Sequence, residues 1–287
     1  MCGVTLASAV QVRESAPIQN PHNILIYDLE RVPGRAIVKH RGLTIEGDFW
    51  DLGSWKHTIG RRIHADDVIE WPRTICAAWR WYGENKIHFA AEWHKGGHEA
   101  FIQTVWKAMD RADVIVGHNI VGFDNRKMLS DFMVYGIPRT SSFKAYDTLR
   151  EARRAGFESN TLDALCKRLG ITAKSGAYSV ATARAAVAGN AEARRELKSY
   201  NMGDIDASTA IYDRLRPYSS AHPHSVVGDG HALDRVSCHA CWGHDLAPNG
   251  VRLAQQILYR EYRCNDCGAI NQGTAHSRAA ITRGVPA

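Results

Sequence analysis

The sequence of 287 residues predicts an α/β domain, with a mixed β-sheet flanked by helices, followed by a small C-terminal metal-binding module. Short apolar strands alternate with helical segments, which is typical of α/β domains. Two early strands look like a hairpin, which favours a mixed sheet over an all-parallel one. Near the C-terminus, four cysteines form two Cys-x-x-Cys pairs, Cys238/Cys241 and Cys264/Cys267.

Individual elements follow from local patterns. Short apolar runs bounded by turn residues predict strands at 23–30, 73–79, 86–90 and 113–117, and a short strand or turn at 144–147. Helical spacing of apolar residues, with capping and stop residues, predicts helices at 98–111, 123–135, 159–169 and 191–215. Residues 31–72 give no clear pattern. The expected organisation is a flexible leader at 1–22, the α/β domain at 23–217, a linker at 218–234, the cysteine module at 235–272 and a disordered tail at 273–287.

Composition limits the function classes. Hydrophobic residues make up 45% of the chain, which excludes global disorder. No apolar run approaches the roughly 20 residues that span a bilayer, and residues 1–17 lack the features of a secretory signal. We therefore expect a cytoplasmic protein without a membrane partner.

The formal net charge is +6, and the segment 144–198 contributes much of it, with 11 Lys/Arg against 6 Asp/Glu. A basic surface suits a polyanion such as nucleic acid, because binding releases counterions. A solvated helical surface would also explain this charge.

Five polar residues in three segments carry the candidate chemistry. Asp28 and Glu30 lie two apart at the end of a predicted strand, so both side chains point to the same face. Asp124 ends the segment Gly117–Asp124, between a strand and a helix. Tyr200 and Asp204 are four apart in the long predicted helix and project together. Taken singly, these residues also fit a solvated strand end, a helix N-cap and ordinary helix surface.

Jointly, the carboxylates point to phosphodiester hydrolysis. Four carboxylates in one site would repel one another, and divalent cations would remove that penalty. Two Mg²⁺ ions about 3.5–4 Å apart can stabilise the attacking and leaving oxygens of a phosphodiester. A nearby tyrosine hydroxyl could orient the attacking water or accept its proton.

These motifs resemble the DnaQ-like 3′–5′ exonucleases of the RNase H-like fold. The three matching segments are Ile26–Glu30, His118–Asp124 and Tyr200–Asp204. The position five before Asp204 is Ser199 rather than His, which favours the DEDDy branch, whose mark is a tyrosine. Stretches such as Ala91–Lys95 also resemble bacteriophage-encoded members, which would place the protein in a bacterial host's cytoplasm.

The resemblance implies roles for particular residues. Asp28, Glu30, Asp124 and Asp204 would ligate two Mg²⁺ or Mn²⁺ ions, and Tyr200 would position the water. The other implied contacts involve substrate: Leu29 and Phe123 beside the 3′-terminal nucleotide, Asn119 on sugar or phosphate, and Lys174 on phosphate. For Lys174 a plain surface position is an alternative. Asp147 would either shape the site or cap a helix.

The four cysteines predict one structural Zn²⁺, because paired thiolates form closed tetrahedral sites. The module resembles a zinc ribbon, with a hairpin through Val251–Tyr262 between its cysteine pairs. His239 and His244 are alternatives for one ligand. An arginine–aromatic group suits base stacking or is ordinary strand surface: Arg252, Arg260, Arg263, Tyr259 and Tyr262. The module could also recruit a replication or repair protein.

The expected function is a 3′–5′ exonuclease on DNA, acting on single-stranded or frayed 3′ ends and releasing nucleoside 5′-monophosphates. One alternative is an exoribonuclease, since these residues do not distinguish the two sugars. Another is a non-catalytic nucleic-acid-binding protein, although all five motif residues are present. A recombinase-type RNase H-like enzyme is disfavoured by the Tyr-x-x-x-Asp helix.

Overall fold

The computed structural model describes residues 23–40, 43–49, 63–172, 178–219, 222, 237–254 and 257–278. The chain divides into two compact units. One is His22–Tyr212, and the other includes the C-terminal part from Asp213 onward. The expected leader at 1–22 and most of the expected linker lie outside the described residues.

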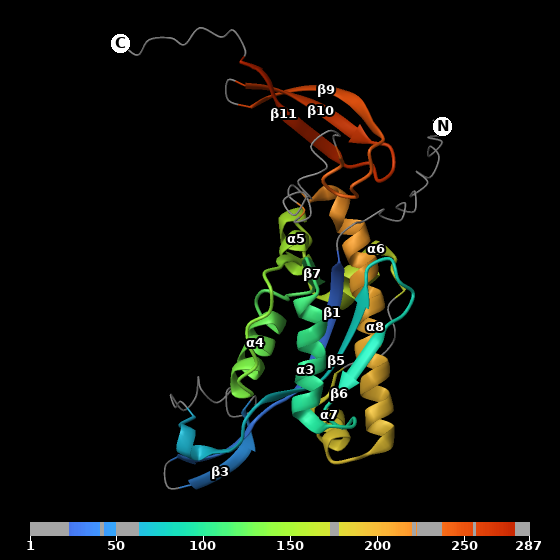
Figure 1. The fold of residues 1–287 in the computed structure, drawn as a ribbon. Coiled ribbons are helices and arrows are strands. Elements are labelled where there is room, and N and C mark those ends of the chain that lie inside the picture. Colours follow the sequence, from blue (N-terminus) through green and yellow to red (C-terminus); the bar gives the residue numbers. More distant parts are fainter. Residues whose placement is uncertain are drawn as a thin grey trace, which may run out of the picture. The chain divides into compact units, whose positions relative to one another are not determined.

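A five-stranded sheet forms the centre of the larger unit (Figure 1). Its order is β6-β5-β1-β7-β8. The strands are β1 Ile24–Val32, β5 Arg73–Trp81, β6 His88–Ala91, β7 Val114–Gly117 and β8 Lys144–Asp147. The β5 strand is antiparallel to β1 and β6, whereas β1, β7 and β8 are mutually parallel neighbours. The predicted mixed sheet is confirmed.

Six helices accompany this sheet within the described residues: α3 Gly97–Asp110, α4 Asp124–Val134, α5 Thr148–Ala155, α6 Leu162–Leu169, α7 Val180–Val187 and α8 Ala191–Leu215. The predicted long helix is confirmed at both ends. Sequence patterns did not predict α5 or α7. The α5 helix buries only Thr148 and Ala152, and α7 buries only Ala183 and Ala186, so neither helix buries a large apolar side chain that would mark it in the sequence.

Strand alternation in β1 decides what faces each helical layer. Leu25, Tyr27 and Leu29 join the core that includes residues of α3 and α4. Ile24 and Ile26 face the other way and pack with Tyr212 of α8. Because alternation continues along β1, Asp28 and Glu30 emerge on the same side as α8. The face of β1 that packs against α3 and α4 therefore belongs to the hydrophobic core, and the face toward α8 carries the polar site.

A second, three-stranded sheet occupies the region that gave no clear pattern. Its order is β3-β2-β4, with β2 Arg35–His40, β3 Leu43–Asp48 and β4 Val68–Glu70 after the short helix η1 Ala65–Asp67. Ala36 and Val38 are its buried residues. So small a core leaves little apolar periodicity, which explains why the sequence pattern was uninformative here.

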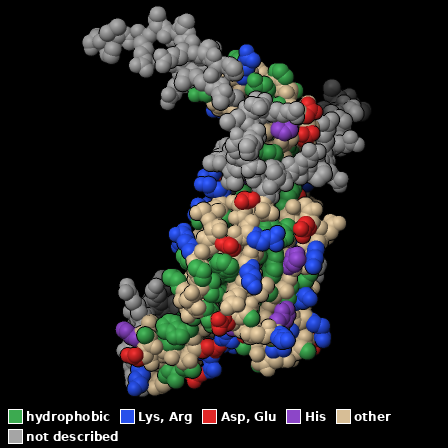
Figure 2. Space-filling model, in the orientation of Figure 1, with side chains coloured by type: hydrophobic (Ala, Val, Ile, Leu, Met, Phe, Trp, Pro, Cys, Tyr) green, Lys and Arg blue, Asp and Glu red, His purple; other side chains and the backbone are tan. Residues whose placement is uncertain are grey.

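The surface charge of the larger unit is dispersed on the face seen in Figure 2, where Lys and Arg side chains are spread among Asp and Glu. Local pairs account for part of it: Lys167 bonds to Asp163 at 2.8 Å and Arg154 to Glu151 at 2.6 Å. These pairs favour a solvated helical surface for that part of the basic segment. Among the described helices, none has the length and apolarity needed to cross a membrane.

The C-terminal unit contains a three-stranded antiparallel sheet in the order β11-β10-β9. Its strands are β9 Leu246–Ala254, β10 Ile257–Cys264 and β11 Ile270–Arg278, preceded by the short helix η2 Arg216–Tyr218. The β9–β10 hairpin confirms the predicted one. Residues 273–278, which were expected in a disordered tail, instead continue β11 in backbone pairing with β10. The rest of the expected tail lies outside the described residues.

Candidate active site

Three carboxylates converge where β1 passes α8. One oxygen each from Asp28, Glu30 and Asp204 lies within 4.8 Å of the others. Asp28 and Glu30 share a face of β1, and Asp204 comes from α8, far along the chain. The end of β1 and helix α8 thus bring together residues that belong to separate sequence motifs.

The α8 helix contributes two further groups. The Tyr200 hydroxyl hydrogen-bonds to the Asp204 carboxylate. Asn201, which is fully buried, donates from Nδ2 to Asp28 Oδ2 at 2.6 Å. Its Oδ1 atom is buried without a hydrogen-bond partner among the described residues. The sequence interpretation missed Asn201, although its position three residues before Asp204 places it on a neighbouring part of the same helical face.

Asp124 reaches the site because β7 is short. The parallel pairing between β1 and β7 covers only Ile24–Ile26 of β1. Beyond it, a hydrogen bond from the Leu29 backbone N–H acts to lower the pKa of the Asp124 carboxyl group. Asp124 is 5% exposed, and its charge acts on both Asp28 and Glu30. It lies outside the closest group of three carboxylates.

Asp147 shapes the loop that precedes Asp124. Its two carboxylate oxygens accept from the backbone N–H groups of Asn119 at 3.0 Å and Val121 at 3.2 Å. It also accepts from Leu149 N–H at 3.1 Å, which caps α5. Asn119 has a φ of 64°, in the left-handed region. Asp147 is therefore a helix cap, as one alternative expected, and its carboxylate also holds the loop that precedes Asp124.

The predicted substrate contacts separate into three cases. The side chains of Asn119 and Phe123 are exposed, so both are available to a ligand. The Leu29 side chain is 5% exposed and lies in the core on the face opposite Asp28 and Glu30. Strand alternation turns this side chain inward, and the expected place of Leu29 beside the 3′-terminal nucleotide stays a prediction. Lys174 lies outside the described residues.

Burial and mutual repulsion raise the carboxyl pKa values. Burial, followed by neighbouring carboxylates, holds the pKa of Asp28 and of Glu30 well above the usual range. Burial likewise raises the pKa of Asp124 to about 7 and that of Asp204 to about 6. Clustered carboxylate oxygens with unfavourable mutual charge are the donor set that divalent cations stabilise. Asp28, Glu30, Asp124 and Asp204 therefore fit a divalent-metal site.

The pKa shifts predict a pH dependence for the metal-free protein. Folding raises the pKa values of these carboxyl groups, so their protonated forms stabilise the folded state. This stabilisation is complete below the pKa values of the unfolded chain, about 4. It is lost as pH rises through about 6 and about 7, where Asp204 and Asp124 ionise. We expect the thermal midpoint in EDTA to fall between about pH 5 and pH 8, and Mg²⁺ or Mn²⁺ to restore it at pH 8. Asp204→Asn should flatten the dependence. A midpoint that rises across this range would contradict the account.

A second cluster joins the four cysteines. Their Sγ atoms lie within 4.8 Å of one another, with Cys238–Cys267 at 3.6 Å and Cys241–Cys264 at 3.5 Å. A tetrahedral ion with metal–sulfur distances of about 2.3 Å separates its sulfurs by about 3.8 Å. The described cysteines form no disulfide. This geometry fits one metal ion.

The two cysteine knuckles share a backbone feature. Trp242 follows the first pair with a φ of 66°, and Gly268 follows the second with a φ of 77°. The histidine alternatives are less suitable. Both ring nitrogens of His239 have other partners, Asn271 Oδ1 at 2.8 Å and Ser219 O at 2.7 Å. His244 is exposed and outside the cluster. The cysteines alone therefore complete the donor set.

The fold and the carboxylate site define an RNase H-like protein. Residues 73–216 match the RNase H superfamily, which is half of the chain, and the chain belongs to that superfamily. The matched segment includes Asp124, Tyr200 and Asp204. Strand β1, which carries Asp28 and Glu30, precedes this segment and pairs with its strands β5 and β7. Membership of this superfamily supports a nucleic-acid hydrolase that uses divalent metals.

Comparison with individual proteins adds little detail. No curated protein matches the chain. Among solved structures, the chain is similar to the family B DNA polymerase from the hyperthermophilic archaeon Pyrobaculum calidifontis, with 14% sequence identity and a TM-score of 0.46. The match covers 69% of this chain and 25% of that one, so the chain spans about a quarter of the polymerase's length.

Proposed function

We propose that the protein is a metal-dependent 3′–5′ exonuclease of the DEDDy type that acts on DNA. The observation that carries this proposal is the convergence of Asp28, Glu30 and Asp204, with the Tyr200 hydroxyl bonded to Asp204. Single-stranded or frayed 3′ ends would be hydrolysed to nucleoside 5′-monophosphates. The choice of DNA, the polarity and the tyrosine branch rest on the motif resemblance.

Each site residue has a proposed task. Asp28, Glu30, Asp124 and Asp204 would hold two Mg²⁺ or Mn²⁺ ions. When bound, these ions would neutralise developing phosphodiester charge and lower the pKa of the attacking water. The chain's own contribution is to hold that water through the Tyr200 hydroxyl. The exposed Phe123 and Asn119 would contact the 3′-terminal nucleotide.

We also propose that the four cysteines hold one structural Zn²⁺ in a zinc ribbon. The support is the fit between the sulfur separations and a tetrahedral site. In this proposal the ribbon grips nucleic acid or recruits a replication or repair protein.

The test is a time course on a 5′-labelled single-stranded DNA oligomer beside a matched RNA oligomer, with Mg²⁺ or Mn²⁺. A ladder that shortens from the 3′ end of DNA, and disappears in EDTA, is the expected result. A clear preference for RNA would replace the proposal with an exoribonuclease. Binding of either strand without cleavage would favour the non-catalytic alternative.

Tyr200→Phe removes the hydroxyl and little else. We expect kcat to fall about a hundredfold, because misplacing a reacting group by about 1 Å can cost roughly 10²-fold. The ring is only partly buried, so the thermal midpoint should change little. Steady-state kinetics measure kcat, and thermal unfolding followed by circular dichroism measures the midpoint, in the variant and the wild type. Wild-type kcat in this variant would remove Tyr200 from the proposed chemistry.

A further inference from the structure

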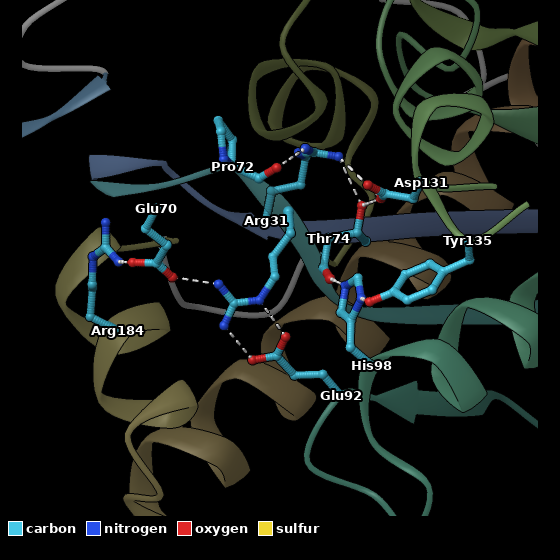
Figure 3. A network of polar contacts seen from close by, with 10 residues as sticks. Arg31, Glu70, Pro72, Thr74, Glu92, His98, Asp131, Tyr135 and Arg184 are labelled. Carbon is cyan, nitrogen blue, oxygen red and sulfur yellow. Dashed lines mark hydrogen bonds and ion pairs between the residues drawn. The ribbon is translucent and has the colours of Figure 1, made fainter. Parts of the chain in front are cut away.

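Three buried polar side chains join β1, β5 and α4 beneath the carboxylate site. Arg31 is 9% exposed, Thr74 0% and Asp131 5%. Arg31 Nη1 donates to Thr74 Oγ1 at 2.9 Å and lies 3.4 Å from Asp131 Oδ2, while the Thr74 hydroxyl donates to Asp131. Figure 3 shows these side chains pointing toward one another from separate elements. We call them the Arg31–Thr74–Asp131 clamp.

Each end of the clamp belongs to a secondary-structure element that also carries a candidate metal ligand. Arg31 follows Glu30 directly, at a register shift in the pairing of β1 with β5. Such irregularities re-aim side chains near active sites. Asp131 follows Asp124 by seven residues on α4, about two helical turns, so both lie on one side of the helix. The clamp therefore connects the backbone that carries Glu30 to the helix that carries Asp124.

Further contacts hold the clamp in place. Arg31 Nη2 donates to Pro72 O at 3.0 Å, and the Tyr178 hydroxyl donates to Arg31 O. His98 joins Thr74 O at 2.7 Å to the Tyr135 hydroxyl at 2.6 Å, which ties the C-terminal end of α4 to the same strand (Figure 3). Asp131 and Tyr135 thus hold α4 at two points beyond Asp124. The distance between α4 and β1 therefore has little freedom to vary.

Stability alone is a poor explanation for such a pair. Replacing a buried ion pair with apolar groups of similar volume is often neutral or stabilising. We therefore infer that Arg31, Thr74 and Asp131 are positioning residues that set the separation of Glu30 and Asp124 for divalent-metal binding. This inference rests on the proposed function, since it concerns the same carboxylate site.

The test measures Mn²⁺ binding without nucleic acid, by electron paramagnetic resonance of the free ion. The double variant Arg31→Met/Asp131→Leu removes both charges together. We expect its Mn²⁺ affinity to fall at least tenfold, since groups that orient metal ligands typically contribute roughly 10–100-fold. Circular dichroism should show a folded protein. The milder substitution Thr74→Val should also lower the Mn²⁺ affinity. It replaces the double variant in the test if the double variant does not fold.

The matched control is Arg73→Met/Glu92→Leu. Arg73 bonds Glu92 at 2.8 and 3.0 Å, and neither side chain bonds to β1 or α4 among the described contacts. Its Mn²⁺ affinity should stay within about twofold of wild type. Unchanged affinity in the folded clamp variants, or an equal loss in the control, would overturn the inference. Wild-type protein that binds Mn²⁺ but cleaves no strand would overturn only the proposed function, and wild type that binds no Mn²⁺ would overturn both.

Discussion

Asp28→Asn is expected to abolish cleavage while making the metal-free protein more stable. The substitution removes one ligand of the proposed metal site, and several kcal/mol of transition-state stabilisation correspond to a loss of about a thousandfold or more in kcat. At neutral pH it also removes a buried group whose pKa is raised by burial and by its carboxylate neighbours. The asparagine can still accept the Asn201 hydrogen bond.

The measurements are single-turnover cleavage in Mn²⁺ and the thermal midpoint in EDTA. Asp163→Asn is the matched control, because Asp163 is exposed and pairs only with Lys167 among the described ion pairs. The control should behave as wild type in both assays. Asp28→Asn protein that cleaves within tenfold of wild type would remove Asp28 from the site, and a lower midpoint in EDTA would contradict the electrostatic account.

Cys264→Ser is expected to eliminate the proposed zinc site and unfold the C-terminal sheet. The four sulfurs are the main component of a small buried cluster, which otherwise contains Ala240, Ala269 and Leu246. Structural zinc contributes about 10–16 kcal/mol of apparent binding energy in small modules, far more than so small a core supplies. Zinc content should fall from one ion per chain to nearly none, and limited proteolysis should cut within β9–β11.

His244→Gln is the control for this substitution, because His244 was the exposed alternative ligand. It should retain one zinc per chain and resist proteolysis as wild type does. The thermal transition of the larger unit should persist in both variants, because His22–Tyr212 forms its own compact unit. Zinc retained by Cys264→Ser, or lost from His244→Gln, would reassign the ligands.

Much of the fold followed from short-range patterns. The α8 helix begins and ends where its spacing and Pro217 indicate, and the four-residue separation of Tyr200 and Asp204 was enough to place them together. The same applies to Asp28 and Glu30, because a two-residue spacing determines a strand face. The meeting of these two pairs is tertiary, and only the motif resemblance anticipated it.

Other features could not be predicted, and the causes are equally local. The alternation that places Asp28 and Glu30 on one strand face also turns the Leu29 side chain into the core. Asn201 was overlooked because one buried amide in a helix has no sequence signature. The Arg31–Thr74–Asp131 clamp joins residues roughly 40–100 apart in the chain, which no periodicity reveals.

The most direct test of the central claim is the first product released from a linear single-stranded DNA labelled at its 3′-terminal nucleotide, beside the same strand closed into a circle. In Mn²⁺ or Mg²⁺, a 3′–5′ exonuclease is expected to release the label as a nucleoside 5′-monophosphate at the earliest times and to leave the circle intact. Label released in longer fragments, or a circle that is cut, would contradict hydrolysis from a free 3′ end.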